Sequence, residues 1–319
     1  MAFSKNKNLS EVEIARKKYM RKKFVSNAVW PVARFIIIIC LSFVILYPIL
    51  YMLSTAFAPQ AEMSDPSRVW LPKKLILSNI VDAWDAMEYP KTLGYTLLVN
   101  GVSALLQVLS CALTGYGFAR FQFKGKNLLF GLVILMIIVP PQILTLQQKT
   151  QFQNFPLGSL LNTPFVMYLP ALFANGLRAG LFIFIFRQFF RGLPKELEDA
   201  AYLDGCGPLK TFIIVMIPNA VSSFITVFLF SIVWYWNDTY ILPTFISGTQ
   251  STISMKISDV GDIMLTKLYG KADEGGRTKN DVFVWLEAAC LLAMLPIIIV
   301  YVFLQKYFTE GIERSGLVG

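Results

Sequence analysis

An acidic stretch between Pro194 and Pro218 separates two long hydrophobic segments of this 319-residue chain. Charged side chains are costly in hydrocarbon, so the stretch must lie at a membrane surface or outside the membrane, where another protein can contact it. Carboxylates at such a surface can pair with arginines of a partner. The chain has no His, the commonest metal ligand and the side chain that titrates most readily near neutral pH. We therefore predict a docking site, and no enzymatic activity or metal site.

The residues after Pro194 favour a short helix. Proline suits the first turn of a helix because its missing N–H is not needed there. Carboxylates in that turn are favoured by the helix dipole, by about 0.3–1 kcal/mol each. Leu197, Ala200 and Ala201 share one face at spacings of three and four. Gly205 accepts the left-handed conformation that ends a helix, so we expect a short helix with small residues on one face.

The composition places this helix in an integral membrane protein. Hydrophobic residues make up 55% of the chain and charged residues 15%, whereas an average soluble domain carries about 25% charged residues. Windows of about 20 apolar residues predict spanning helices. Six such windows occur, at roughly 35–57, 93–119, 127–145, 164–188, 211–236 and 282–304. We expect an all-α, polytopic membrane protein with six transmembrane helices.

Lys and Arg predict the orientation of these spans. Eighteen fall on the side of the N-terminal arm and ten on the other side, over longer loops, which favours both termini in the cytoplasm. Because the basic residues flank hydrophobic runs, they indicate topology and not nucleic-acid binding. The predicted parts are a basic cytoplasmic arm at 1–29, a six-helix domain at 30–308 with a cytoplasmic loop at 192–210, and a cytoplasmic tail at 309–319. The four scattered cysteines are interpreted as free thiols.

Polar side chains inside the spans mark a candidate path for a solute. In the second span they recur at spacings of three and four and share one face: Asn100, Ser103, Gln107, Ser110 and Thr114. Such a stripe suits either a water-filled path or hydrogen bonds between helices, and the sequence leaves both open. Aromatic faces and an amide suit a neutral, hydroxyl-rich solute near the outer end of the fifth span, at Tyr235, Trp236 and Asn237. An interfacial aromatic anchor is the alternative there.

Two charged residues, Arg178 and Glu287, fall within the predicted spans. A charge at the centre of a bilayer costs about 2.5–3.5 kcal/mol on insertion scales. Each of the two residues therefore needs a partner, water or the membrane edge, and both allow a purely structural role.

The acidic stretch resembles the EAA loop of the inner-membrane permease subunits of ATP-binding cassette importers. That pattern is E-A-A, three residues, G, nine residues, I, one residue, then L-P. The positions of this chain that follow the same spacing are Asp199, Ala200, Ala201, Gly205, Val215, Ile217 and Pro218. The departures from the pattern are Asp for Glu, Val for Ile and Ile for Leu, and all three are conservative.

The resemblance implies a type I importer permease fold and a coupling helix that seats in a cleft of the ATPase subunit. It assigns the ATPase contact to Glu196, Leu197, Asp199, Ala200, Ala201, Asp204 and Gly205. Further segments resemble the second permease of maltose-type sugar importers, at 115–127, 138–147, 186–205 and 235–243. The C-terminus resembles tails that reach the ATPase dimer interface, which implies a contact at Gly316 and Gly319. A frayed polar tail is the alternative.

The resemblance also implies partners and a substrate. We expect a second permease subunit, two cytoplasmic ATPases that carry ATP and Mg, an extracellular solute-binding protein, and a sugar, oligosaccharides above all. This chain has no phosphate-binding loop of the form G-x-x-x-x-G-K-[ST], so no cofactor is expected in it. The alternatives are a permease for amino acids or phosphate, an ion-coupled secondary carrier, and a membrane receptor or scaffold.

Overall fold

The computed structural model describes residues 11–65, 70–248, 250–270 and 282–316, and no strand occurs among them. The contacts of the backbone divide the chain into residues 1–54 and residues 55–319. Helix α1 (Glu11–Ala56) holds the described part of the first unit. Its segment Val29–Ala56 has 28 residues, a mean hydropathy of 2.7 and almost no buried surface. An apolar helix surface of this length is long enough to cross a bilayer.

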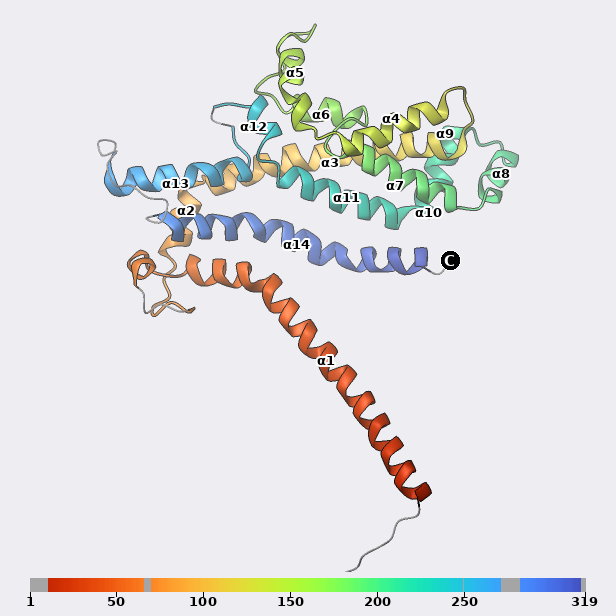
Figure 1. Ribbon diagram of the computed structural model, residues 1–319. Coiled ribbons are helices and arrows are strands. Elements are labelled where there is room, and N and C mark those ends of the chain that lie inside the picture. The colour runs from red at the N-terminus through yellow and green to blue at the C-terminus, as the bar shows by residue number, and fades with distance from the viewer. Residues whose placement is uncertain (1–10, 66–69, 249, 271–281, 317–319) are drawn as a thin grey trace, which may run out of the picture. The chain divides into compact units, whose positions relative to one another are not determined.

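The second unit is a bundle of helices. Figure 1 shows α3, α4, α7, α11 and α14 running alongside one another, with α8 at one end of the bundle and α2 at the other. We refer to these ends as the α8 end and the α2 end. The elements in chain order are a 3₁₀ turn η1 (Gln60–Ser64), α2 (Ser78–Ala86), α3 (Tyr89–Arg120), α4 (Lys126–Ile138), α5 (Gln142–Gln153), α6 (Phe165–Leu172), α7 (Ala179–Gly192), α8 (Glu196–Leu203), α9 (Pro208–Thr211), a π-helical turn η2 (Phe212–Met216), α10 (Ile217–Asn219), α11 (Val221–Trp236), α12 (Ile241–Phe245), α13 (Ile253–Tyr269) and α14 (Phe283–Gly316).

The described helices confirm the six-span, all-α architecture. Three are long and apolar enough to cross a membrane by themselves, namely Val29–Ala56, Tyr89–Arg120 and Phe283–Lys306. Two bent pairs, α4 with α5 and Pro208–Asn219 with α11, bring the number to five. Helices α6 and α7 together cover the predicted fourth span. The four cysteines are free, as the sequence predicts.

Three of the predicted spans are broken, whereas the sequence predicts them as continuous. Helix α4 ends at Ile138 and α5 leaves at 105°, because Pro140 and Pro141 lack N–H donors and disfavour a helical residue before them. Helices α6 and α7 are separated where Ala174 and Arg178 have φ values of 53° and 58°, outside the right-handed helical region. The fifth span bends by 83° between α10 and α11, just after the π-helical turn.

The C-terminal part of α3 packs against α7, and glycine permits the close approach. A Cβ atom at Gly115 would lie 2.7 Å from Cβ of Phe186, and one at Gly180 would lie 2.7 Å from the carbonyl oxygen of Val133 on α4. Small residues at such crossings allow the helix backbones to approach in a membrane. Helices α3, α4 and α7 therefore form a tight three-helix contact.

Apolar side chains are buried between the helices in three clusters. A cluster at the α2 end joins α2, α3, α13 and α14 and includes Met87 and Val260. A second cluster joins α3, α4, α7 and α11 and includes the buried rings of Phe186 and Phe190. The third joins α3, α6, α11 and α12 around Leu242. Since α3 contributes to all three clusters, it holds the bundle together from end to end.

Replacing Gly115 with Ala should destabilise the bundle, because the new Cβ would collide with Phe186 on α7. Overpacking of this kind costs about 1–3 kcal/mol, so the midpoint of thermal unfolding in detergent should fall. Gly117→Ala is the matched control, since a Cβ there meets nothing within 4 Å. Equal midpoints for the two variants would contradict the close contact of α3 and α7.

Candidate functional site

Helix α8 is the short helix that the sequence predicts after Pro194. It begins at Glu196 with Lys195 as N-cap, so Pro194 lies just before the cap and not in the first turn. At the other end, Gly205 has a φ of 76°. Its N–H donates to the carbonyl of Tyr202 at 3.0 Å, and the N–H of Cys206 donates to the carbonyl of Ala201 at 2.9 Å. These two bonds form a Schellman cap, which depends on a residue that adopts positive φ without strain.

One carboxylate fixes the inner face of α8 to the end of α3. Oε2 of Glu198 lies 2.8 Å from Nε of Arg120, and both side chains are 7% exposed. The hydroxyl of Tyr116, one turn earlier on α3, donates to Oε1 of the same carboxylate at 2.7 Å. Nη2 of Arg120 donates to the carbonyl of Leu193 at 2.8 Å, in the connection from α7 to α8. We refer to Tyr116, Arg120 and Glu198 as the α8 anchor.

Tyr116 connects the α8 anchor to the helices around it. Its ring centroid lies 5.6 Å from that of Phe190 on α7 and 5.0 Å from that of Phe212 in the π-helical turn. It also meets the ring of Phe121, just beyond the end of α3, at 5.6 Å. Close-packed interiors transmit displacement. A movement of α8 therefore acts on α3, on α7 and on the start of the fifth span together.

The opposite face of α8 is open to contact with another molecule. The exposed residues of the helix and its cap are Glu196, Asp199, Ala200, Tyr202, Leu203, Asp204 and Gly205. Leu203 is 89% exposed. Leu197 is half-buried and Ala201 is buried. The face predicted from Leu197, Ala200 and Ala201 is therefore divided, with Ala200 on the open side and Ala201 packed toward this chain.

Sequence reasoning missed the α8 anchor. Charge counting treats Arg120 only as a topology signal, and the helix dipole accounts for Glu198 without a partner. The available signal is the spacing of Tyr116 and Arg120, since residues four apart share one face at the end of a span. That spacing gives no indication of a partner 78 residues later in the chain.

The polar stripe of α3 lies inside this chain. Asn100, Ser103 and Gln107 are each at most 1% exposed. The side-chain amide of Gln107 donates to the carbonyl of Leu177 and accepts a hydrogen bond from the hydroxyl of Tyr235. These are contacts between α3, the α6–α7 break and α11. Gln107 therefore forms hydrogen bonds between helices, and a role for the stripe in a solute path stays a prediction.

The aromatic residues predicted near the outer end of the fifth span separate into buried and exposed members. Trp236 is buried and donates from Nε1 to the carbonyl of Ala293 on α14 at 3.0 Å. Asn237 is exposed. It lines a cavity of about 130 Å³ together with Arg178 and Trp234, at the breaks of the third and fourth spans. Of the residues predicted for the path, Asn237 lines this cavity and Tyr235 lines a smaller one, of about 40 Å³, at the α6–α7 break.

The C-terminal residues continue the last helix. Helix α14 runs to Gly316, well past the predicted end of the sixth span at 304. The backbone of residues 309–316 is therefore helical. Gly319 lies outside the described residues, and the ATPase contact predicted for Gly316 and Gly319 stays a prediction.

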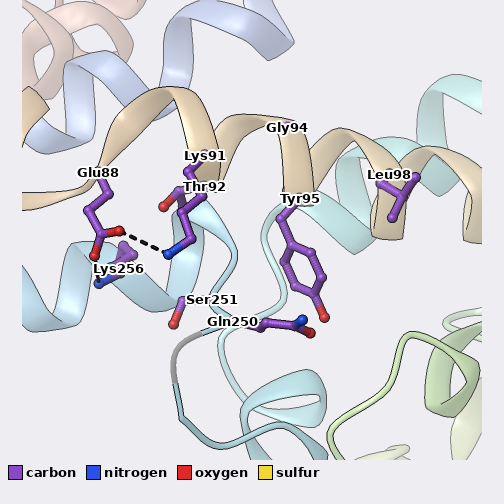
Figure 2. A pocket seen from close by; sticks show the side chains of 9 residues that line it. All are labelled: Glu88, Lys91, Thr92, Gly94, Tyr95, Leu98, Gln250, Ser251 and Lys256. Carbon is purple, nitrogen blue, oxygen red and sulfur yellow. Dashed lines mark hydrogen bonds and ion pairs between the residues drawn. The ribbon is translucent and has the colours of Figure 1, made fainter.

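A larger cavity, of about 360 Å³, opens at the α2 end. Figure 2 shows the carboxylate of Glu88 pairing with Lys91 at 3.1 Å and with Lys256 of α13 at 3.5 Å. The hydrogen bond from Lys91 holds the pKa of Glu88 below its usual range, so this carboxylate stays charged at neutral pH. The lining is completed by Thr92, Gly94, Tyr95, Leu98, Gln250 and Ser251. The cavity presents hydroxyl, amide and charged groups toward the α2 end.

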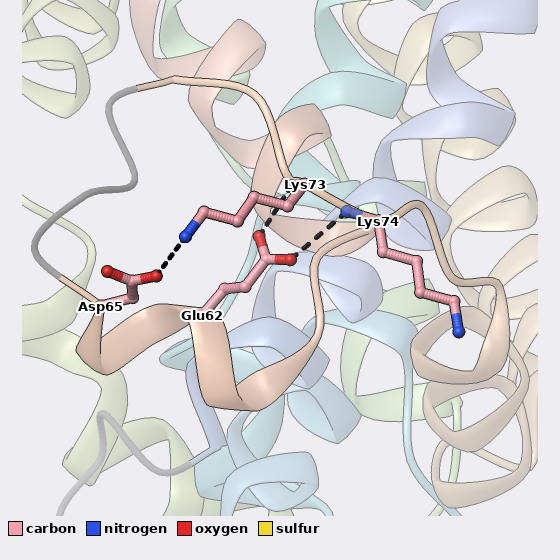
Figure 3. A network of polar contacts seen from close by, with 4 residues as sticks. All are labelled: Glu62, Asp65, Lys73 and Lys74. Carbon is pink, nitrogen blue, oxygen red and sulfur yellow. Dashed lines mark hydrogen bonds and ion pairs between the residues drawn. The ribbon is translucent and has the colours of Figure 1, made fainter.

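Polar contacts also order the connection that precedes α2. In Figure 3 the carboxylate of Glu62 accepts the backbone N–H groups of Lys73 and Lys74 at 3.0 and 3.3 Å. Nζ of Lys73 pairs with Asp65 at 2.5 Å. The hydrogen bond to Asp65 raises the pKa of Lys73. The two arms of this connection are thereby held together and offer a defined surface near the α2 end.

A six-span bundle that presents a short acidic helix at one end has the architecture of a transport permease. Residues 112–314 match the model of the family described as binding-protein-dependent transport system inner membrane component. The chain belongs to this family of membrane-embedded transport subunits.

Several relatives and a solved structure resemble the chain over most of its length. The arabinooligosaccharides transport system permease protein AraQ of Halalkalibacterium halodurans is 28% identical, over 88% of this chain and 93% of AraQ. The melibiose/raffinose/stachyose import permease protein MelC of Bacillus subtilis is also 28% identical, over 89% of this chain and 94% of MelC. A chain of a bacterial ABC transporter involved in the import of the acidic polysaccharide alginate matches with a TM-score of 0.68 at 19% identity, over 89% of this chain and 98% of that chain. The similarity to this solved structure shows that the two chains share a fold.

Replacing Glu198 with Ala should destabilise the protein strongly, because Arg120 is left buried without its ion-pair partner. Removing one member of a buried pair costs about 3–5 kcal/mol. Glu196→Ala is the matched control on the exposed face of α8 and should change stability by less than about 0.5 kcal/mol. The measurement is thermal unfolding of the purified protein in detergent.

The double variant Glu198→Ala with Arg120→Ala should regain part of the loss, since no charge then remains unpaired. If Glu198→Ala unfolds at the same temperature as Glu196→Ala, the α8 anchor contributes nothing to stability and its role is refuted.

Proposed function

We propose that this chain is the permease subunit of an ATP-driven, binding-protein-dependent importer of sugars, and of oligosaccharides in particular. The observation that carries the proposal is α8, an acidic helix that is exposed on one face and fixed by a buried ion pair on the other. Membership of the binding-protein-dependent family supports it. The named substrates of AraQ and MelC, two relatives that align over most of their length, favour oligosaccharides.

In this proposal α8 is the coupling helix and contacts an ATPase subunit. Its exposed carboxylates, Glu196, Asp199 and Asp204, pair with basic residues of the ATPase, and Ala200 lets the partner surface approach closely. Closure of the two ATPases on ATP and Mg pushes α8, and the α8 anchor passes the displacement to α3 and α7. Ala201 and Leu197 act from the inner face, by packing α8 on this chain.

The same proposal sets the orientation and the partners. The α8 end and both termini lie in the cytoplasm, as the distribution of Lys and Arg favours. The α2 end then faces outward, where the ordered connection before α2 and the cavity beside Glu88 are available to a solute-binding protein. A second permease completes the path, and ATP and Mg belong to the ATPases.

Broken spans also occur in ion-coupled carriers, where they form the ion and substrate sites. The coupling helix distinguishes the two mechanisms, because a secondary carrier has no use for an acidic cytoplasmic helix with an exposed docking face. A permease for amino acids or phosphate would keep the same α8 and differ in its solute contacts. Uptake assays with sugars decide between these solute classes.

Replacing Ala200 with Trp should abolish copurification of the ATPase, because a large side chain on the open face of α8 prevents close docking. The α8 anchor is untouched, so the variant should still insert and unfold at the wild-type temperature. Leu157→Trp is the control, since that position is 91% exposed in a connection away from α8. Full ATPase retention by Ala200→Trp would contradict the docking role.

Single cysteines should test the orientation, after the four native cysteines are replaced by Ser. A cysteine at Glu196 should resist a membrane-impermeant maleimide in intact cells and react after the membrane is permeabilised. A cysteine at Leu157 should react in intact cells. The reverse pattern would place α8 outside and exclude the ATPase contact.

A further inference from the structure

Arg178 is a half-buried cation at the α6–α7 break, and it has no carboxylate partner in the described part of the chain. It caps the N-terminus of α7, whose 14 residues separate it from Gly192 beside α8. At 1.5 Å per residue this is about 21 Å, which lies within a hydrocarbon layer of about 30 Å. The ion pairs among the described residues do not include Arg178. A lone charge at this depth is costly unless water or a ligand meets it.

An aromatic ring holds the guanidinium in place. Its central carbon lies 4.4 Å from the ring centroid of Trp234 on α11, a cation–π contact that positions Arg without neutralising it. The backbone of Arg178 is left-handed, with φ of 58°, a conformation that is strained for a non-glycine residue. The contact with Trp234 and the left-handed backbone therefore both fix the position of the Arg178 side chain at the α6–α7 break.

The guanidinium borders the cavity of about 130 Å³ described above. Gln142 adds a side-chain amide to its lining, and Tyr240 adds an aromatic ring that is 53% exposed. Asn237 adds its amide oxygen, because its Nδ2 donates to the carbonyl of Val233 at 2.9 Å. Irregular backbone at membrane depth is tolerated where it lines a water-filled cavity. The breaks after α4 and α6 meet this condition, since both contribute to the lining.

Asp238 shares the cavity but is engaged elsewhere. Its Oδ1 accepts the N–H of Ile241 at 2.9 Å and its Oδ2 accepts the N–H of Leu242 at 2.7 Å. Both oxygens therefore serve to start α12. The carboxylate does not form an ion pair with Arg178, whose N–H groups remain available to a ligand.

We propose that this cavity binds the carboxylate of an acidic sugar residue, so that the saccharides carried by the transporter include uronic acids. The inference rests on the proposed function and deepens it by naming the substrate class. A planar guanidinium matches a carboxylate with two parallel hydrogen bonds. The amides of Gln142 and Asn237 suit sugar hydroxyls, and the ring of Tyr240 suits an apolar sugar face.

The size of the cavity fits this assignment. A cavity of about 130 Å³ holds several water molecules, since one water needs about 10–15 Å³ of volume measured in this way. It accommodates the carboxylate edge of one sugar ring and not a whole oligosaccharide. In this proposal the remainder of the saccharide extends out of the cavity toward the second permease.

The test uses the complete complex with its second permease and ATPases, purified into nanodiscs. Binding of trigalacturonate is compared with binding of its methyl ester, which has the same shape without the charges. The wild-type complex should bind the acid at least tenfold more tightly than the ester by calorimetry. Arg178→Gln should abolish this difference, and Arg178→Lys should retain part of it. Lys74→Gln, which removes a cation outside the cavity, should leave the difference unchanged.

Equal affinity for acid and ester in the wild type, no binding of either probe, or an undiminished difference in Arg178→Gln would overturn the inference. Loss of the second permease from the Arg178→Gln complex would also overturn it, because Arg178 would then pair with a carboxylate of that subunit. The ATPase content of the wild-type preparation tests the proposed function separately. If the complex contains the ATPase but does not prefer the acid, the preference for acidic sugars is refuted and the proposed importer function is not.

Discussion

The buried ion pair between Arg120 and Glu198 is the contact on which the architecture of the α8 end depends. Both side chains are removed from water, and the hydroxyl of Tyr116 takes up the second oxygen of the carboxylate. Burying two charges is costly, and the cost is recovered only when the geometry satisfies their hydrogen bonds. The result is a helix whose inner face is fixed while its outer face stays open. A helix that transmits movement needs this combination, because a loosely attached helix would be displaced without moving the helices beside it.

The middle of the bundle is organised differently from its α8 end. The third and fourth spans are interrupted there, and the polar side chains divide into two groups. Gln107 and Tyr235 are buried and join helices, so they act as scaffolding. Arg178 and Asn237 border a cavity at the breaks. Interrupted helices expose backbone groups that lipid cannot satisfy, so such breaks belong where water or solute passes. The rigid α3, which contributes to all three apolar clusters, connects this region to the α8 anchor.

Much of the fold follows from local sequence patterns. Apolar windows predict the spans because a bilayer sets their length, and α8 is predictable because Pro194 and Gly205 mark its two ends. The breaks within the spans are harder to predict from the sequence. Pro140 and Pro141 are visible in the sequence, but the 105° bend that follows them depends on what packs around it. Positive φ at Ala174 has no sequence signal, since alanine ordinarily avoids that region.

The candidate site likewise has features that the sequence predicts and features that it does not. The exposed carboxylates of α8 can be identified from spacing alone, whereas the inward position of Ala201 depends on where α8 rests on the bundle. The partner of Glu198 lies on another helix, far away in the chain, and no local pattern reveals a contact of that range. Cavities at helix breaks are equally hidden, because they form from segments that meet only after folding.

The central claim is that the open face of α8 contacts an ATPase. Photo-crosslinking tests it most directly, with benzoylphenylalanine introduced at Asp199 on the open face and, in a second variant, at Leu157 far from it. Irradiation of membranes from cells that express the whole transporter should join the ATPase to the chain carrying the label at Asp199 and not to the chain carrying it at Leu157. An ATPase crosslink from Leu157, or none from Asp199 in a complex that still hydrolyses ATP, would contradict the account.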